Sequence, residues 1–166
     1  MRKARAVCDS SVLIAFAKIR RLDLLLDAFE SPLLIPYPVY AEAVDAGVAK
    51  REPDAFLIRK KFNDGSIAAK KPKKHVDWPF LGVGESAVIS LALQNKIACV
   101  CLDEAPARNA AKRVGLKPVG TLGILYSAYQ NGSLSRHQTL DLLGQLIRLD
   151  FRISPKILEQ FKKSVS

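Results

Sequence analysis

Short apolar runs alternate with helix-like segments along most of the chain, and this alternation constrains the fold more than any other feature. The runs that we expect to be strands lie at 4–8, 32–36, 97–102 and 117–119, and the turn at 63–66 leads into a further apolar run at 67–69. Strands that alternate with helices in short units predict an α/β fold with a mainly parallel sheet, covered by helices on both faces. Such sheets bind ligands beside the carboxyl ends of their strands.

The helices expected between and after the strands lie at 12–17, 22–29, 39–46, 53–61, 85–94, 105–114 and 121–132, followed by two within 135–165. We take Gly47 as the stop signal of the third helix and Ser154-Pro155 as the start signal of the last. The length of 166 residues suits one domain, so we expect a single domain over 1–166, with 135–166 as C-terminal helices that pack on it.

Four acidic residues follow the predicted strands. Asp9 and Asp103 come directly after strands, Glu42 lies in the second turn of the helix after 32–36, and Glu85 lies where Gly82-Val83-Gly84 opens a helix. A parallel sheet would place these carboxylates at one edge, where they repel one another unless cations neutralise them. Carboxylate oxygens suit Mg²⁺ or Mn²⁺, and two such ions about 4 Å apart are a known arrangement for phosphodiester hydrolysis.

Each acid also has a purely structural explanation. Asp9 and Asp103 are good helix N-caps, and Glu85 lies in a first helical turn, where the helix dipole favours a negative charge. Glu42 fits a solvated helix face equally well. The combination favours a site, because independent caps need not all fall at one edge of the fold.

The charge of the chain points to a polyanionic partner. Lys and Arg number 26 against 16 Asp and Glu, which gives a net charge of +10 and an isoelectric point near 9.7. The positions that we expect to contact RNA are Lys70, Lys71, Lys73, Lys74 and Arg108. A solvated loop, and a plain surface cation at Arg108, remain the alternatives for these residues.

The remaining features concern compartment and competing chemistries. The three cysteines are odd in number and lie in apolar runs, so they read as buried thiols of a cytoplasmic protein. No apolar run approaches the ~18 residues that a membrane span needs, so we expect no membrane association. The two histidines show no ligand spacing that would indicate zinc, and no Gly-x-Ser-x-Gly elbow is present.

Four motifs together resemble the PIN-domain ribonucleases, the group that includes VapC-type toxins. The motifs are Asp9-Ser10-Ser11-Val12-Leu13-Ile14, Pro38-Val39-Tyr40-Ala41-Glu42, Gly82 to Ala92, and Leu102-Asp103-Glu104 through Ala107-Arg108. The run from Gly120 to Leu125 is similar to a segment of a small, poorly characterised archaeal and bacterial subgroup. The resemblance covers nearly the whole chain, with the order and spacing of the motifs intact.

The resemblance implies a three-layer α/β/α sandwich and a Mg²⁺- or Mn²⁺-dependent endoribonuclease. The catalytic metal ligands would be Asp9, Glu42, Glu85 and Asp103, with a supporting hydroxyl from Ser11, or from Ser10 as the second choice. It also implies a homodimer, and it is compatible with the toxin of a toxin–antitoxin pair, whose partner would be an antitoxin protein.

Two positions depart from the family pattern. The subgroup usually has two aspartates where this chain has Asp103-Glu104, so Glu104 is a supporting candidate with a longer side chain. Cys101 stands where many PIN proteins carry a small hydroxyl residue. These departures leave a second hypothesis open: a catalytically weak or inactive PIN-like module that binds RNA or a protein.

Overall fold

The computed structural model describes residues 2–166, whose strands form one parallel sheet. The strands are β1 (Ala6–Cys8), β2 (Leu33–Pro36), β3 (Ile67–Lys70), β4 (Cys99–Cys101) and β5 (Lys117–Val119). Their order is β3-β2-β1-β4-β5, and each pair of neighbours is parallel. The predicted parallel sheet is therefore confirmed. The fourth strand is shorter than the predicted 97–102, because the Ile97 N–H donates to Ala92 and closes the preceding helix instead.

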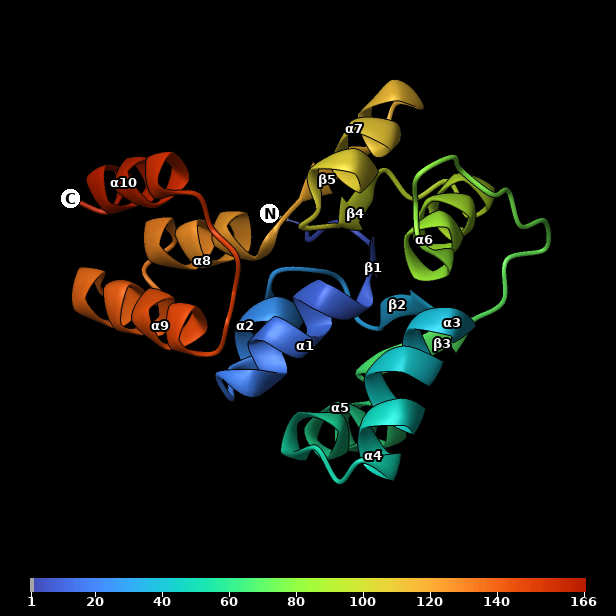
Figure 1. Ribbon diagram of the computed structural model, residues 1–166, viewed down its shortest axis with the longest axis horizontal. Coiled ribbons are helices and arrows are strands. Elements are labelled where there is room, and N and C mark those ends of the chain that lie inside the picture. The colour runs from blue at the N-terminus through green and yellow to red at the C-terminus, as the bar shows by residue number, and fades with distance from the viewer. Residues whose placement is uncertain (1) are drawn as a thin grey trace.

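Helices cover both faces of the sheet, as the sequence predicts. On one face lie α1 (Ser10–Lys18), α2 (Leu22–Asp27) and α5 (Pro53–Asn63), and on the other lie α6 (Val83–Gln94) and α7 (Ala105–Arg113) (Figure 1). This arrangement follows from right-handed crossovers, because the chain moves outward from β1 to β3 and then returns across β1 to β4 and β5. The result is the three-layer α/β/α fold.

The helix after β2 is longer than the sequence predicts and contains an irregular turn. It runs through α3 (Tyr37–Tyr40), a π-helical segment η1 (Ala41–Asp45) and α4 (Ala46–Ala49). The prediction that Gly47 stops this helix is wrong. An ideal Cβ at Gly47 would lie 2.5 Å from the Cβ of Ala55 on α5, so glycine stands there because two helices pack closely. Glu42 lies in the π-helical segment, a distortion that is frequent at functional sites.

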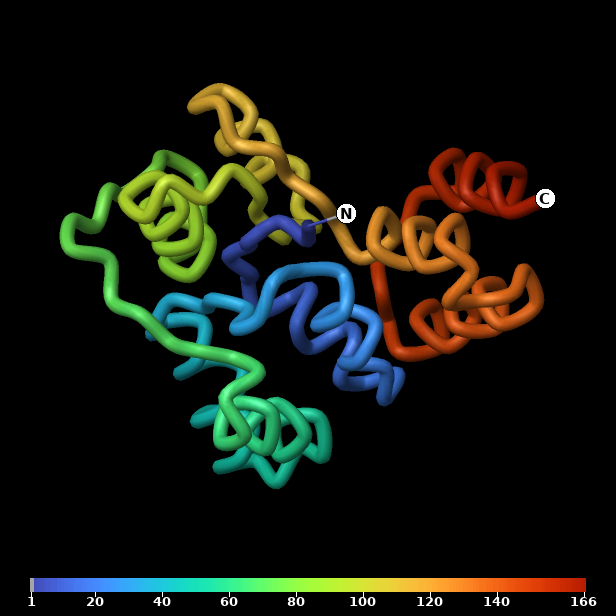
Figure 2. The backbone as a smooth tube through the Cα atoms, turned by 180° about the vertical axis from the view of Figure 1, so that it is seen from behind, coloured from blue at the N-terminus to red at the C-terminus, as the bar shows by residue number. Residues whose placement is uncertain are grey.

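The C-terminal third forms α8 (Thr121–Gln130), α9 (Arg136–Arg148) and α10 (Pro155–Ser164). These helices lie together on one side of the molecule in both backbone views (Figures 1 and 2). The hydroxyl oxygen of Ser154 accepts a hydrogen bond from the Ile157 N–H, which confirms the predicted start of the last helix. Apolar side chains of α9 and α10, among them Leu143, Leu146 and Phe161, join the same buried cluster as the strands.

The buried cluster includes the apolar residues of β1 and β2, and α6 is buried from Ser86 through Ala92 because it lies against the sheet. Cys8, Cys99 and Cys101 all carry free thiols. Within residues 2–166, the structure has no helix of the length and apolar character that crossing a bilayer would require.

Candidate active site

The order of the strands makes the neighbouring strands β1 and β4 the topological switch point of the sheet. The chain reverses its direction across the sheet at this point, and ligands of open α/β sheets bind outside the carboxyl ends of such strands. Cys8 and Cys101 are partners in the register of the two strands, and the Asp9 N–H donates to the Cys101 carbonyl at 3.1 Å. Asp9 and Asp103 thus follow the carboxyl ends of the two strands that flank the switch point.

Asp9 is both a helix cap and a buried acid that faces other acids. Its carboxylate accepts hydrogen bonds from the Val12 N–H at 3.0 Å and from the Ser11 hydroxyl at 3.1 Å, and its exposed fraction is 2%. Burial raises the pKa of Asp9 to about 7, and the nearby carboxylates of Asp103 and Glu85 act in the same direction. The N-cap explanation therefore holds for Asp9, and its position beside other acids is compatible with a site.

Asp103 is held by the beginning of α8. The Thr121 N–H donates to its Oδ1 and the Thr121 hydroxyl to its Oδ2, each at 2.7 Å. Burial raises the pKa of Asp103, although the two Thr121 bonds and the Arg108 guanidinium oppose the shift. The suggestion that Asp103 caps its own helix does not hold, because Glu104 occupies the N-cap position of α7.

Glu42 and Glu85 reach the same hollow as Asp9 from two other helices. This hollow has a volume of about 610 Å³ and includes Asp9, Ser11, Glu42 and Glu85 in its lining. Glu42 is exposed on the π-helical segment, whereas the half-buried Glu85 accepts a hydrogen bond from the Gly82 N–H at 3.1 Å. An ideal Cβ at Gly84 would lie 3.7 Å from Oε2 of Glu42, so the first turn of α6 approaches the Glu42 carboxylate.

The four carboxylates lie near one another without forming a closed metal site. Within residues 2–166, no three side chains of Asp, Glu, His or Cys converge closely enough to hold one ion. Three of the four predicted ligands instead accept hydrogen bonds from groups of the protein, namely Asp9, Glu85 and Asp103. The structure thus places the predicted ligands at one edge but does not bring their oxygens to a common point.

Comparison with known proteins decides the family. A family model for the PIN domain matches residues 5–166, which is nearly the whole chain. The chain belongs to the PIN-domain family. PIN domains are generally nucleases, and they typically use divalent metals. No curated protein matches the sequence significantly.

The donor set of this PIN domain fits a hard divalent cation in the kind of its ligands, although no three of them converge within residues 2–166. Carboxylate oxygens are the ligands that Mg²⁺ and Mn²⁺ prefer, and a buried Asp9 beside two other acids is costly without a neutralising charge. No salt bridge within residues 2–166 involves any of the four acids. A divalent cation would supply the neutralising charge that these acids do not receive from a salt bridge in the described residues.

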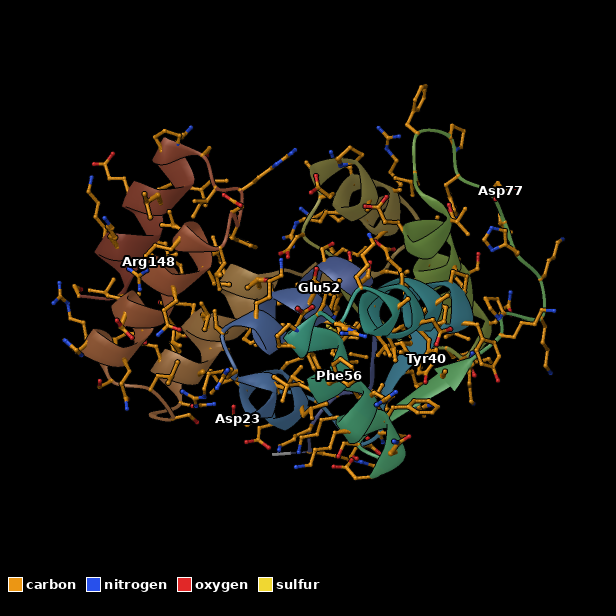
Figure 3. The ribbon with its side chains drawn as sticks, turned by 60° about the horizontal axis from the view of Figure 1, so that its bottom comes forward. Asp23, Tyr40, Glu52, Phe56, Asp77 and Arg148 are labelled. Atoms are coloured by element: carbon orange, nitrogen blue, oxygen red, sulfur yellow. The ribbon has the colours of Figure 1, made fainter. Side chains whose placement is uncertain are left out.

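Two of the predicted RNA-binding lysines, Lys73 and Lys74, lie far along α6 from the carboxylates of the PIN domain. Lys70 ends β3, and the loop that follows returns along α6, where the Lys73 N–H bonds to the side chain of Gln94. Gln94 is nine residues beyond Glu85, which corresponds to about 14 Å along a helix. Figure 2 shows this loop on the outside of α6, and Figure 3 shows Asp77 within it at the periphery.

Arg108 is the predicted basic residue that does lie at the carboxylate edge. Its guanidinium donates to the Leu102 carbonyl at 3.0 Å. An ideal Cβ at Gly120 would lie 2.8 Å from Oδ1 of Asp103 and 3.1 Å from Arg108. Glycine at this position therefore makes room for an acid and a base that meet beside the end of β5.

Sequence reasoning missed two parts of the site in this PIN domain. Thr121 lies two residues after the end of β5, next to Gly120. The search for acids that follow a strand, which selects Asp9 and Asp103, would also select Thr121 if it included hydroxyl groups. The segment between α9 and α10 also reaches the carboxylate edge: Asp150, Phe151 and Arg152 border the same hollow as Asp103. No local pattern marks this segment, because the packing of the C-terminal helices brings it there.

Proposed function

We propose that this PIN domain is a Mg²⁺- or Mn²⁺-dependent endoribonuclease that hydrolyses phosphodiester bonds of single-stranded RNA. The observation that carries the proposal is the buried carboxylate of Asp9, which shares its hollow with Glu42 and Glu85 and lies near Asp103, the acid that follows the neighbouring strand β4. This negative edge lies where open α/β sheets bind their ligands. The basic charge of the chain supports an RNA partner.

The residues of the chain divide into ligands and supports. Asp9, Glu42, Glu85 and Asp103 would hold the metal, which supplies an activated water and stabilises the leaving oxygen. The hydroxyl of Ser11 and the N–H of Val12 fix the orientation of Asp9, and Thr121 does the same for Asp103. Such supporting bonds typically change metal affinity or activity 10–100-fold. Glu104 is exposed beside Asp103 and adds negative charge there.

Cleavage of a labelled single-stranded RNA tests the proposal. We expect hydrolysis that requires Mg²⁺ or Mn²⁺ and that is lost in Asp9→Asn and in Asp103→Asn. Asp27→Asn is the matched control, because this aspartate is exposed at the end of α2. Hydrolysis that persists in both site variants with a chelator present contradicts the proposal.

A second candidate function is RNA or protein binding without cleavage. It is favoured by the Asp103 carboxylate, both of whose oxygens already accept bonds from Thr121, and by the lack of a converged ligand set within residues 2–166. In this case the wild-type protein binds RNA but releases no product with either metal. Neutral substitution of Asp9 then leaves RNA affinity unchanged or improves it.

The biological setting proposed here is that of a cytoplasmic toxin with an antitoxin partner. It rests on the PIN fold and on an acidic edge that a basic antitoxin segment can cover. Co-expression of the neighbouring reading frame tests the idea directly. Growth inhibition by this chain alone, relieved by the neighbour, supports it, and growth that is unaffected in both cases contradicts it.

A further inference from the structure

A second hollow lies on the other side of Asp103. It has a volume of about 610 Å³ and is bordered by the ends of three helices, by Asp103 itself and by the segment between α9 and α10. Its lining includes the N-cap residues of α7, α8 and α10, which are Glu104, Gly120 and Ser154. Ser11 borders this hollow and the one that contains Glu42, so the two adjoin at the start of α1.

Two arginines face this second hollow. Arg108 reaches it from α7, and Arg152 reaches it from the segment between α9 and α10. In the part of the chain that the structure describes, neither arginine forms a salt bridge, and the only acceptor of Arg108 is the Leu102 carbonyl. Most of their N–H donors are therefore available to an anion, and guanidinium groups match the geometry of phosphate.

The backbone holds Arg152 firmly in place. Asp150 has a left-handed backbone (φ 63°), and the Phe151 N–H donates to the Leu146 carbonyl at 3.0 Å, so the chain turns sharply at the end of α9. Two residues after Arg152, Ser154 caps α10. The arginine thus lies on a short segment that is fixed at both ends.

We propose that Arg152, together with Arg108, binds the backbone phosphate of single-stranded RNA next to the phosphate that is cleaved, on the Asp103 side. The inference rests on the proposed function for the position of the cleaved bond, but phosphate binding does not depend on cleavage. Lys73 and Lys74 lie beside Gln94 at the far end of α6, whereas Arg108 and Arg152 both border the hollow that adjoins the carboxylates. The positive ends of three helix dipoles add to their attraction.

Acids also border this hollow and repel a phosphate, so phosphate binding there requires the positive charge of the arginines. Glu104 and Asp150 line it together with Asp103, so an approaching phosphate meets negative charge as well. Removal of one arginine therefore leaves the repulsion unbalanced. Removal of one acid has the opposite effect, and Asn at position 150 tolerates the left-handed backbone that Asp150 adopts.

Binding of a short fluorescent single-stranded oligoribonucleotide, measured by anisotropy in EDTA over a series of salt concentrations, tests the inference without any catalytic turnover. We expect Arg152→Gln to weaken binding about 10-fold, as the loss of a hydrogen bond to a charged group does. The slope of log K against log salt should fall by about 0.7, the value for one phosphate contact on a single strand. Asp150→Asn should bind more tightly than the wild type.

Arg148→Gln is the matched control, because Arg148 is an exposed arginine on the last turn of α9 that does not border the hollow (Figure 3). Equal losses in Arg148→Gln and Arg152→Gln, or no loss in Arg152→Gln, overturn the inference. The double variant Arg108→Gln/Arg152→Gln should lose less than the sum of the single losses if both bind one phosphate; strict additivity counts against a shared phosphate. Cleavage with Mn²⁺, measured separately, shows whether the proposed function fails while this inference stands.

Discussion

Thr121 holds both oxygens of Asp103: its backbone N–H donates to Oδ1 and its hydroxyl to Oδ2, each at 2.7 Å. The two residues are 18 positions apart and follow neighbouring strands β4 and β5. Thr121 thereby fixes the direction of a carboxylate that is half-buried at the site. A supporting residue of this kind acts through its partner rather than on a substrate.

Replacement of the Thr121 hydroxyl should impair the site while leaving the fold intact. We expect Thr121→Val to lower Mn²⁺ affinity and RNA cleavage about 10–100-fold, because the freed Asp103 oxygen loses its orientation. Thr121→Ser keeps the hydroxyl and should restore most of both. Thr139→Val is the control, since the buried Thr139 hydroxyl donates to the Ser135 carbonyl on α9. A Thr121→Val protein with wild-type Mn²⁺ affinity would show that the contact is only structural.

The metal-free protein should lose stability as the pH rises from about 4 to 7. Asp9 has a pKa of about 7 when folded and near 3.8 when unfolded. Below this window the carboxyl is protonated in both states; within it only the folded state keeps the proton, so the free energy of unfolding falls as pH rises. The shift corresponds to at most about 4 kcal/mol. Urea unfolding in EDTA at pH 5 and pH 8 measures the part of this loss of stability that falls above pH 5.

Asp9→Asn should flatten this dependence, because asparagine does not titrate, and should be more stable than the wild type at pH 8 without metal. Asp27→Asn should retain the wild-type profile. A wild-type stability that stays constant or rises between pH 5 and pH 8 would contradict the burial of a charged Asp9.

Addition of Mn²⁺ should stabilise the wild type at pH 8, because a ligand that binds only the folded state raises the free energy of unfolding. A concentration one hundred times the dissociation constant gives about 2.7 kcal/mol. Glu42→Gln should respond less than the wild type. Glu52→Gln should respond fully, because the exposed Glu52, labelled in Figure 3, precedes α5 and lines neither of the two hollows. Thermal unfolding with and without Mn²⁺ provides the measurement, and an equal response of Glu42→Gln and wild type would exclude Glu42 as a ligand.

Gly47 should not tolerate even a methyl group. Its Cβ would lie 2.5 Å from that of Ala55, so Gly47→Ala forces α4 and α5 apart and should cost about 1–3 kcal/mol of unfolding free energy. Gly144→Ala is the matched change on α9. The nearest atom there is the flexible end of Arg148 at 3.4 Å, and removing glycine from a helix interior should stabilise by up to about 1 kcal/mol. Similar effects of the two changes in urea unfolding would disprove the packing explanation.

Neutralising Lys73 and Lys74 should affect long RNA more than short RNA. The two lysines lie beside Gln94, about 14 Å along α6 from Glu85, so only a long strand bound at the carboxylates reaches them. We expect Lys73→Gln/Lys74→Gln to weaken binding of a long single strand and to leave cleavage of a short oligonucleotide unchanged. Equal losses with both substrates would place the lysines in the site itself.

Much of the architecture is readable from local patterns, because strands and helices leave periodic signals. The apolar runs ending at Cys8 and near Cys101 mark parallel strands, and parallel strands bring their following residues to one edge. That reasoning selects Asp9 and Asp103 without any structure. Local patterns mislead at Gly47. A glycine there looks like the end of a helix, but it is required because α5 packs closely against it.

Distances between side chains are not contained in such patterns. The order of residues places four carboxylates at one edge, but only packing decides that Thr121 binds Asp103 and that no three carboxylates converge within residues 2–166. Packing also brings Arg152 to the hollow that Asp103 borders and carries Lys73 to the far end of α6. The local sequence determines periodicity and turns. Contacts between distant segments depend on how whole helices pack against one another, and this packing cannot be inferred from any short stretch of residues.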